Sequence, residues 1–369
     1  MTVQELEKLA AQYLEGKVDT QLDFTNTQIA LAHKTDEQLK KSTWIFSMMN
    51  KPWLVNIGSK LTILAIKLRL PFVESIIKNT IFDHFCGGTT LLESQQSIEV
   101  LGAHNVDTFL DYGVEAKQNE DDFNLTMNEN LKAIEFASQN NFIPVVSSKI
   151  TGLGRFGLFE KIQAGESLIP QEEQELKNIN KRMDSICHMA QQKGVKIFFD
   201  AEESWIQDTL DHLVNKMMER YNKEKVVVYN TFQMYRHDRL QFLIDSFDRA
   251  SQKGYLLGAK LVRGAYMEKE RARAEEMGYE SPIHPTKKAT DDAYNLAIRF
   301  CIQNYDRIAL CNASHNAYSN KLQAELMLDN KIPKDHSHML FSQLYGMSDQ
   351  LTFNLAKAGY NAGKYLVYG

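Results

Sequence analysis

Eight short apolar runs, separated by amphipathic stretches, constrain the fold of this chain more than any other feature. The runs are DTFLDYGVE (107–115), FIPVVSSKI (142–150), VKIFFDAEE (195–203), KVVVYNTFQ (225–233), LLGAKLVRGAY (256–266), RIALCNASHN (307–316), HMLFSQLYG (338–346) and GKYLVYG (363–369). Runs that are apolar throughout, alternating with helical periodicity, are typical of parallel strands whose two faces are both covered. Eight such units in about 250 residues predict an α/β fold, a (β/α)8 barrel.

A doubly wound sheet is the competing architecture. That fold commonly has a G-x-G-x-x-G turn after its first strand, and GLGRFG (152–157) matches the pattern and follows an apolar run. The next helical pattern does not begin at once, however, and a single match of this kind is a weak signal. The alternation of runs therefore favours the barrel.

The first part of the chain is expected to be helical throughout. We predict an N-terminal helical arm over residues 1–80 and a barrel domain over residues 81–369, with no Pro/Gly/Ser linker between them. Residues 38–73 contain no Asp or Glu, yet carry Lys40, Lys41, Lys51, Lys60, Lys67 and Arg69 among large apolar side chains. This segment is either a peripheral surface that touches anionic lipid or an arm whose apolar face packs on the barrel.

Charge and cysteine content limit the possible partners and compartments. A net charge of −5 argues against nucleic acid as the main partner, because no basic field exists to collect phosphates. The four cysteines form no C-x-x-C pair, which suggests neither a zinc site nor a disulfide framework. The N-terminus does not read as a signal peptide, and no apolar run is long enough for a transmembrane helix. We expect a cytoplasmic protein, with a peripheral location on the inner face of a bacterial membrane as the further option.

Polar side chains end every one of the eight runs. They are Asp111, Lys149, Asp200 with Glu202, Gln233, Lys260 with Arg263, Ser314-His315-Asn316, Gln343 and Tyr365. The carboxyl ends of barrel strands meet at one mouth, where barrel enzymes place their chemistry, although some barrels hold satisfied polar layers there. Cations inside a strand are costly unless an anion pairs with them, and the sequence places no obvious anion near Lys260.

Two chemistries can be weighed from these residues alone. His315 has no partner histidine and the mouth is rich in cations, so the sequence predicts no metal site. Lys149, desolvated at a barrel mouth, could act as the Schiff-base nucleophile of a lyase or aldolase. At a predicted helix start, Thr286 can cap while Lys287 and Lys288 oppose the helix dipole, which suggests an anion bound at that terminus.

Motifs from about residue 80 to the end together resemble the proline dehydrogenase family. In order they are FCGGTTL (85–91), LDYGVE (110–115), SSKIT (147–151), FFDAEES (198–204), NTFQMY (230–235), GAKLVRGAYMEKERARA (258–274), ASHN (313–316) and KYLVYG (364–369). The resemblance implies a distorted TIM-type barrel that binds FAD without a Rossmann domain. It also implies the first step of proline catabolism, in which hydride passes from C5 of L-proline to N5 of FAD, giving Δ1-pyrroline-5-carboxylate, and electrons continue to a membrane quinone.

The same resemblance implies roles for individual residues. The positions that match the substrate shell are Lys149, Asp200, Leu261, Tyr266, Leu344 and Tyr365, of which Lys149, Asp200 and Tyr365 stand closest to the chemistry. The positions that match the cofactor site are Gln233, Lys260, Val262, Gly264, Thr286, Lys288, Ser314, His315 and Asn316. Lys260 would face the flavin ring, Lys149 would pair with the proline carboxylate, and Gly264 would let the backbone approach the cofactor.

The chain departs from the family pattern at its C-terminal end. Val367 stands where the family usually has proline, and Val keeps the N–H that Pro lacks. The family also continues past Gly369 into a last barrel helix that carries an arginine pair for the substrate carboxylate. We therefore expect that helix to be absent from this chain. A non-catalytic flavin-binding protein remains an alternative to the enzyme.

Overall fold

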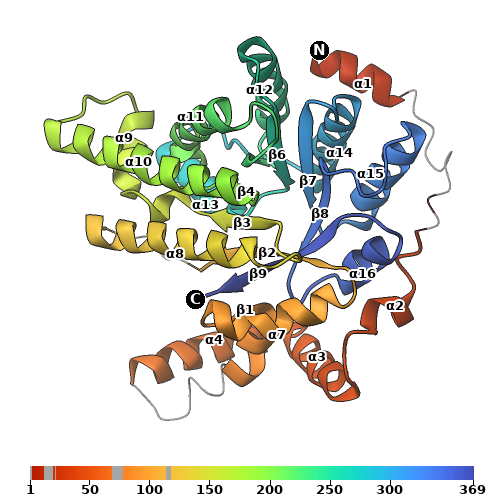
Figure 1. Cartoon of the computed structure of the whole chain (residues 1–369). Helices are drawn as coiled ribbons and strands as arrows, with labels where there is room; N and C mark the ends of the chain where they lie inside the picture. Colours follow the sequence, from red (N-terminus) through yellow and green to blue (C-terminus); the bar gives the residue numbers. More distant parts are fainter. Residues whose placement is uncertain (1, 12–19, 21, 69–77, 114–117) are drawn as a thin grey trace.

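The computed structural model describes residues 2–11, 20, 22–68, 78–113 and 118–369. Its centre is a closed barrel of eight parallel strands surrounded by helices (Figure 1). The strands are β2 (Asp107–Tyr112), β3 (Val145–Ser148), β4 (Lys196–Phe199), β5 (Val228–Gln233), β6 (Leu257–Val262), β7 (Ile308–Ala313), β8 (Met339–Leu344) and β9 (Ala362–Tyr368). Each coincides with one of the eight expected runs, β9 beginning one residue before its run, so the predicted barrel is confirmed. Val114 and Glu115 of the first run lie outside the described residues.

Barrel closure is made by the last strand. β9 pairs in parallel with β2 on one side, where Phe109 lies opposite Tyr365, and with β8 on the other, where Leu344 lies opposite Tyr365. A short strand, β1 (Cys86–Gly88), adds to β9 from outside the barrel. Tyr365 is thereby fixed between strands that come from opposite ends of the barrel sequence.

Helices follow the strands in the expected alternation. They are α7 (Leu91–Gly102), α8 (Glu120–Ser138), α9 (Phe156–Gln163), α10 (Pro170–Lys193), α11 (Ser204–Tyr221), α12 (Arg239–Lys253), α13 (Met267–Met277), α14 (Lys287–Gln303), α15 (Ala317–Asp329) and α16 (Asp349–Lys357), with a 3-10 turn at Ile150–Gly152. Before the barrel lie α1 (Val3–Ala11), α2 (Thr27–Leu31), α3 (Asp36–Met49), α4 (Pro52–Lys67), a π-helical turn (Lys78–Phe82) and α6 (Asp83–Phe85). No described helix is long and apolar enough to cross a membrane.

The GLGRFG stretch (152–157) forms a loop that packs closely against α10. A 3-10 turn ends at Gly152 and α9 begins only at Phe156, so no helix starts directly after the strand. A Cβ on Gly154 would lie 2.4 Å from the side chain of Ile179 on α10. Glycine at this position lets the loop approach α10 closely.

The strand side chains divide into two packed layers because they alternate between the two faces of each strand. Phe109, Val145, Phe198, Tyr229 and Tyr365 belong to the cluster inside the barrel. Leu110, Val146, Ile197, Val228 and Leu261 belong to the larger cluster that includes residues of the surrounding helices. Residues two positions after an interior side chain therefore point into the barrel mouth.

Among the described N-terminal helices, α1 and α2 pack against helices of the barrel, whereas α3 and α4 carry exposed apolar side chains. α1 contacts α14 and α2 contacts α16, where Asn354 donates to the backbone carbonyl of Asn26 at 3.2 Å. α3 and α4 lie beside each other at the edge of the molecule, near β1 and α7 (Figure 1). Large exposed apolar side chains on or next to them are Trp44, Phe46, Met48, Met49, Trp53, Ile57, Leu61 and Leu68. Arg69 and residues 70–73 lie outside the described residues.

Candidate active site

Five polar side chains gather at the carboxyl ends of the barrel strands, and we call them the mouth cluster. They are Asp111 from β2, Lys149 after β3, Asp200 after β4, Lys260 from β6 and Tyr365 from β9. All five of these strand ends were expected to converge because parallel strands of a barrel end on one side. The structure places carboxylates, ammonium groups and a phenol together there, which is suited to binding and proton transfer on a small charged molecule.

Asp200 is the centre of the mouth cluster. Its Oδ1 accepts from the ammonium of Lys260 at 2.6 Å, and its Oδ2 accepts from the hydroxyl of Tyr365 at 2.5 Å. The Lys260 ammonium also lies 4.4 Å from the centre of the Tyr365 ring. The sequence had offered no anion for Lys260, and the structure shows that Asp200 supplies it from a strand sixty residues upstream.

Asp111 differs from Asp200 in its surroundings. It is 7% exposed, and its Oδ1 is a buried atom with no hydrogen-bond partner among the residues that the structure describes. Burial and the charge of Asp200 raise the pKa of Asp111, and the charges of Lys149 and Lys260 act against them, with a net result of about 7. The sequence marked this residue only as a strand end and gave it no role.

Glu202 is a second buried carboxylate behind the mouth. Both of its oxygens accept from the hydroxyl of Thr151, at 2.8 and 2.7 Å. Burial raises the pKa of Glu202 to about 7 despite these hydrogen bonds. Gln233, buried at the end of β5, donates to the backbone carbonyl of Glu202 at 2.7 Å and accepts from the backbone N–H of Ala265 at 3.2 Å. Its amide thus ties the β4 loop to the segment that follows β6.

Lys149 lies half-buried directly after β3. Among the described residues it has no carboxylate within ion-pair distance, although Asp111 and Glu202 are near enough for their pKa values to respond to its charge. A cation in this position is available to an anionic ligand. The sequence prediction that Lys149 meets a carboxylate stays a prediction.

Arg263, just after β6, belongs to a strand-end network. Its Nε donates to Asp291 at 2.7 Å, and its two terminal nitrogens donate to the hydroxyls of Ser314 at 2.6 Å and Ser319 at 3.0 Å. The guanidinium lies 4.4 Å from the centre of the Tyr294 ring. These contacts join β6 to α14 and α15.

The polar residues after β7 are engaged with the protein. Ser314 accepts from Arg263, and Asn316 caps α15 by accepting from the backbone N–H of Ser319 at 3.1 Å. His315 is exposed, and its Nδ1 lies 2.8 Å from the hydroxyl of Ser348. Ser314, His315 and Asn316 were predicted to contact a cofactor. In the structure the side chains of all three also interact with other residues of the protein.

The start of α14 was expected to bind an anion because two lysines lie in its first turn. Thr286 caps the helix as predicted, accepting from the backbone N–H of Ala289 at 3.1 Å. The lysines, however, pair with carboxylates one turn later, Lys287 with Asp291 at 2.5 Å and Lys288 with Asp292 at 2.6 Å. These pairs account for the lysines without a bound anion, so the argument from the helix dipole is weaker than expected.

Four further predicted residues lie in different settings. Val262 and Tyr266 are half-buried beside the mouth, and Leu344 is 46% exposed at the end of β8. Leu261 is fully buried in the cluster that includes the surrounding helices, on the face of β6 opposite Lys260. This position does not fit the predicted contact of Leu261 with a substrate ring.

Gly264 has a packing role that the sequence did not reveal. Its φ is 142°, and a Cβ at this position would lie 2.4 Å from the ring of Tyr235. The close approach that requires glycine is therefore, at least in part, to a tyrosine of the protein. Gly264 and Ala265, which follow Lys260 by four and five residues, are exposed.

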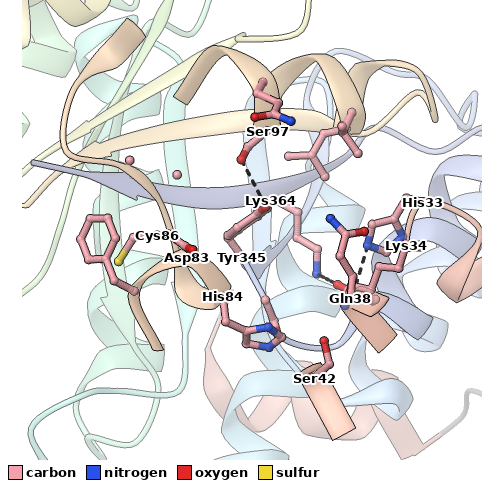
Figure 2. Close-up of a pocket in the computed structure, with 18 of the residues that line it drawn as sticks. His33, Lys34, Gln38, Ser42, Asp83, His84, Cys86, Ser97, Tyr345 and Lys364 are labelled. Atoms are coloured by element: carbon pink, nitrogen blue, oxygen red, sulfur yellow. Dashed lines mark hydrogen bonds and ion pairs between the residues drawn. The ribbon is translucent and has the colours of Figure 1, made fainter. Parts of the chain in front are cut away.

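A cavity of about 470 Å³ lies elsewhere, between α3, β1, α7 and the segment after β8 (Figure 2). Lys364 on β9 and Lys34 before α3 meet Asp349 there, at 2.8 and 2.5 Å. Tyr345 donates to Ser97 at 3.2 Å on another wall. None of the mouth cluster lines this cavity, and its charged groups are already paired. Among the described residues, no group of His, Cys, Asp and Glu is arranged to hold a metal ion.

The fold and the mouth cluster define the class: a (β/α)8 barrel with an enzyme-like site at the carboxyl ends of its strands. The family model described as proline dehydrogenase matches residues 94–369. The chain belongs to the proline dehydrogenase family.

Individual relatives agree with this assignment. The chain is 28% identical to proline dehydrogenase 2, mitochondrial, of Arabidopsis thaliana, over 96% of this chain and 84% of that protein. It is 31% identical to proline dehydrogenase 1, mitochondrial, of Dictyostelium discoideum, over 79% of this chain and 59% of that protein. It is also 32% identical to the carbapenem antibiotics biosynthesis protein CarD of Pectobacterium carotovorum, over 77% of this chain and 73% of that protein.

A solved structure supports the fold. The crystal structure of proline utilization A from Bdellovibrio bacteriovorus inactivated by N-propargylglycine superposes with a TM-score of 0.70 and 18% identity. The superposition covers 99% of this chain and 39% of the proline utilization A chain. This chain therefore matches less than half of the length of that solved protein.

Proposed function

We propose that this chain is a flavin-dependent proline dehydrogenase. It oxidises L-proline to Δ1-pyrroline-5-carboxylate by hydride transfer from C5 of proline to N5 of FAD, and the electrons pass on to a membrane quinone. Membership of the family supports this proposal, and the mouth cluster is the observation that carries it. Lys149, which has no ion-pair partner among the described residues, and the Asp200–Lys260–Tyr365 group both lie near Asp111, and together they can hold a small zwitterion.

Each side chain of the mouth cluster has a role in this proposal. Lys149 pairs with the carboxylate of proline, and the ring of Tyr365 packs against the pyrrolidine. Asp200 holds Tyr365 and Lys260 in place through its two oxygens. Leu344 and Tyr266 close the pocket. Holding C5 against its hydride acceptor is the main contribution of these residues to the rate.

FAD, when bound, supplies the hydride acceptor. The residues fit such a group on two observations: Gly264, four residues after Lys260, is exposed, and the amino end of α14 is exposed. Lys260 would stabilise negative charge on the reduced ring, and Gly264 would face it. The remaining proposed cofactor contacts are Gln233, Val262, Thr286, Lys288, Ser314, His315 and Asn316.

The visible spectrum of the purified protein tests this proposal first. Flavin absorbance that bleaches on addition of L-proline supports it. Flavin absorbance that proline does not change would indicate a non-catalytic flavin-binding protein. Absence of flavin, together with borohydride trapping of a carbonyl substrate on Lys149, would indicate a Schiff-base lyase or aldolase instead.

Membrane contact is proposed through the exposed surface of α3 and α4, on an arm formed by residues 1–80 beside a catalytic barrel of residues 81–369. This α3–α4 surface combines exposed Trp44, Trp53 and Leu61 with exposed lysines, and residues 38–73 contain no acid. Apolar side chains flanked by lysines suit an anionic bilayer surface. The protein would then be cytoplasmic and peripheral, close to its quinone.

Vesicle flotation tests the membrane contact. Vesicles with anionic lipid should retain the protein at low salt and release it at high salt, because the lysine contribution is screened. Leu61→Glu should weaken retention, whereas Leu125→Glu on α8 should not, although the two leucines are 59% and 61% exposed. Equal recovery from neutral and anionic vesicles, or equal loss with both substitutions, would contradict the proposal.

A further inference from the structure

We propose that Asp111 accepts the proton of the substrate's ring ammonium, a step that rests on the proposed function. Proline in water carries a protonated secondary amine, whose nitrogen has no lone pair to offer. A double bond between nitrogen and C5 can form only after that proton leaves. The protein therefore needs a proton acceptor in the mouth, and neither the sequence motifs nor the comparisons assign one.

The position of Asp111 suits this task. It lies on β2 two residues after Phe109, which belongs to the interior cluster, so its side chain points into the mouth. On one side it pairs in register with Ser147 of β3, two residues before Lys149, and on the other with Val367 of β9, two residues after Tyr365. Asp111 thus lies between the two residues proposed to hold proline.

Asp111 also differs from the neighbouring carboxylates in its hydrogen bonding. Asp200 uses Oδ1 for Lys260 and Oδ2 for Tyr365, and both oxygens of Glu202 accept from Thr151. Among the buried carboxylate oxygens in the described part of the chain, Oδ1 of Asp111 alone has no hydrogen-bond partner. A buried acceptor without a donor is costly, and a ligand N–H placed against it removes that cost.

The chemical step is a simple transfer. The N–H bond of the ammonium breaks, an O–H bond forms at Oδ1 of the Asp111 carboxylate, and the electron pair of the broken bond stays on nitrogen. That lone pair then forms the C=N bond as C5 loses its hydride to the proposed cofactor. The proton rests on Asp111 until product leaves.

The groups that face Asp111 set the pH range of this transfer. They are Asp200 on β4, Lys149 after β3, Lys260 on β6, and Tyr365 and Tyr368 on β9. Burial and Asp200 raise the pKa of Asp111 to about 7 against the opposing lysines. Asp111 is therefore mostly protonated at pH 6 and mostly ionised at pH 8, so the free enzyme gains its acceptor as pH rises through neutrality.

Asp111→Asn in the full chain tests the proposal, because the amide keeps the shape of the side chain but cannot take the proton. Proline affinity should fall by about 10- to 100-fold, as for loss of a hydrogen bond to a charged group. Affinity for tetrahydrofuran-2-carboxylate, the proline analogue with a ring oxygen and no N–H, should not fall. Flavin reduction by proline at pH 8 should slow by about 10²- to 10⁴-fold and lose its inflection near neutrality.

Asp107→Asn is the matched control. Asp107 lies on the same strand, four residues earlier, and burial raises its pKa to about 6, but it stands at the opposite end of the barrel. This substitution should leave both affinities and the pH profile unchanged.

A measurement on the unsubstituted protein covers the case in which Asp111→Asn fails to fold. Binding of proline should release a proton to the buffer at pH 6, where Asp111 must give one up, and none at pH 8. If wild-type protein neither binds proline nor bleaches with it, the proposed function fails. If it does both, but Asp111→Asn weakens proline and the oxygen analogue equally, or no proton is released at pH 6, then Asp111 is structural and this inference alone is wrong.

Discussion

Asp349→Asn should be the most destabilising conservative substitution in the region where the N-terminal helices meet the barrel. The carboxylate of Asp349 accepts from Lys364 at 2.8 Å and from Lys34 at 2.5 Å, and it lies 3.5 Å from Nε2 of His33 (Figure 2). The Lys364 side chain is 1% exposed. Without the carboxylate, its ammonium retains only backbone carbonyls, the nearest being that of Met347 at 2.5 Å.

The magnitude follows from that burial. Removing one partner of a buried ion pair costs about 3–5 kcal/mol, because the remaining charge stays in a medium that solvates it poorly. Each kcal/mol shifts the melting temperature by about 2–4 °C in domains of about 150–250 residues, so a fall of roughly 6–20 °C is expected. Thermal melts followed by circular dichroism measure it directly.

The effect should depend on pH in a defined direction. Burial alone would raise the pKa of Asp349, but the hydrogen bond from His33 and the charges of Lys364 and Lys34 hold it well below its usual range. A carboxylate with a depressed pKa contributes stability that is present above its unfolded pKa, about 3.9, and is lost as pH falls toward the folded pKa. The gap between wild type and Asp349→Asn should therefore persist from neutral pH to about pH 5 and close in stronger acid.

Two further variants make the reasoning refutable. Asp83→Asn removes a carboxylate paired with Lys41 at 3.5 Å, where both side chains are about 40% exposed, and should cost less than about 1 kcal/mol. Lys364→Met in the Asp349→Asn background should recover much of the loss, because it removes the stranded charge. A loss no larger than that of Asp83→Asn would show that water in the adjoining cavity solvates Lys364, and the burial argument would be wrong.

Other substitutions test the mouth and the helices around it. Lys260→Met should slow flavin reduction by about 10²- to 10³-fold in stopped-flow experiments, as for loss of one preorganised charge. It should also lower the melting temperature, because it leaves the largely buried carboxylate of Asp200 without its ammonium partner, and an unchanged reduction rate in the folded variant would mark Lys260 as structural. Gly264→Ala should lower the free energy of unfolding by about 1–3 kcal/mol, because it places a Cβ against the ring of Tyr235 at a positive φ. Gly58→Ala should raise it by about 0.5–1 kcal/mol, because Gly58 lies in a helix with open space around it. Thr286→Ala should cost about 1 kcal/mol through loss of the α14 cap, and equal melts would contradict that.

The strands could be predicted from the sequence because each carries its own signal. A buried parallel strand must be apolar throughout, and the helices between must show a period of 3.6 residues, so both patterns are local. The cap at Thr286 is equally local, since it needs only a side chain and the N–H of Ala289. The dipole cost of the lysines beside it was weighed without Asp291 and Asp292, which lie one turn along the same helix and pair with them, and the binding of an anion at this terminus stays a prediction.

Leu261 shows how a motif can mislead where a physical rule would not. The motif places Lys260, Leu261 and Val262 in one site as consecutive letters. In a strand, however, consecutive side chains point to opposite faces, and a one-residue step moves a side chain from the mouth to the helix layer. The period of the strand alone would have separated Leu261 from Lys260, as the structure does.

The contacts of the mouth cluster could not be predicted because they depend on barrel closure. Lys260, Asp200 and Tyr365 come from β6, β4 and β9, and no two of these strands are neighbours in the sheet. They meet because β9 pairs with both β2 and β8 and so closes the sheet into a barrel. In the closed barrel, strand ends that are not adjacent in the sheet face one another across a narrow mouth. Sequence reasoning could name the groups at each end, but the pairing of Lys260 with Asp200 follows from the curvature of the whole sheet. The same closure leaves Asp111, between β3 and β9, with a carboxylate oxygen for which the described part of the chain provides no donor.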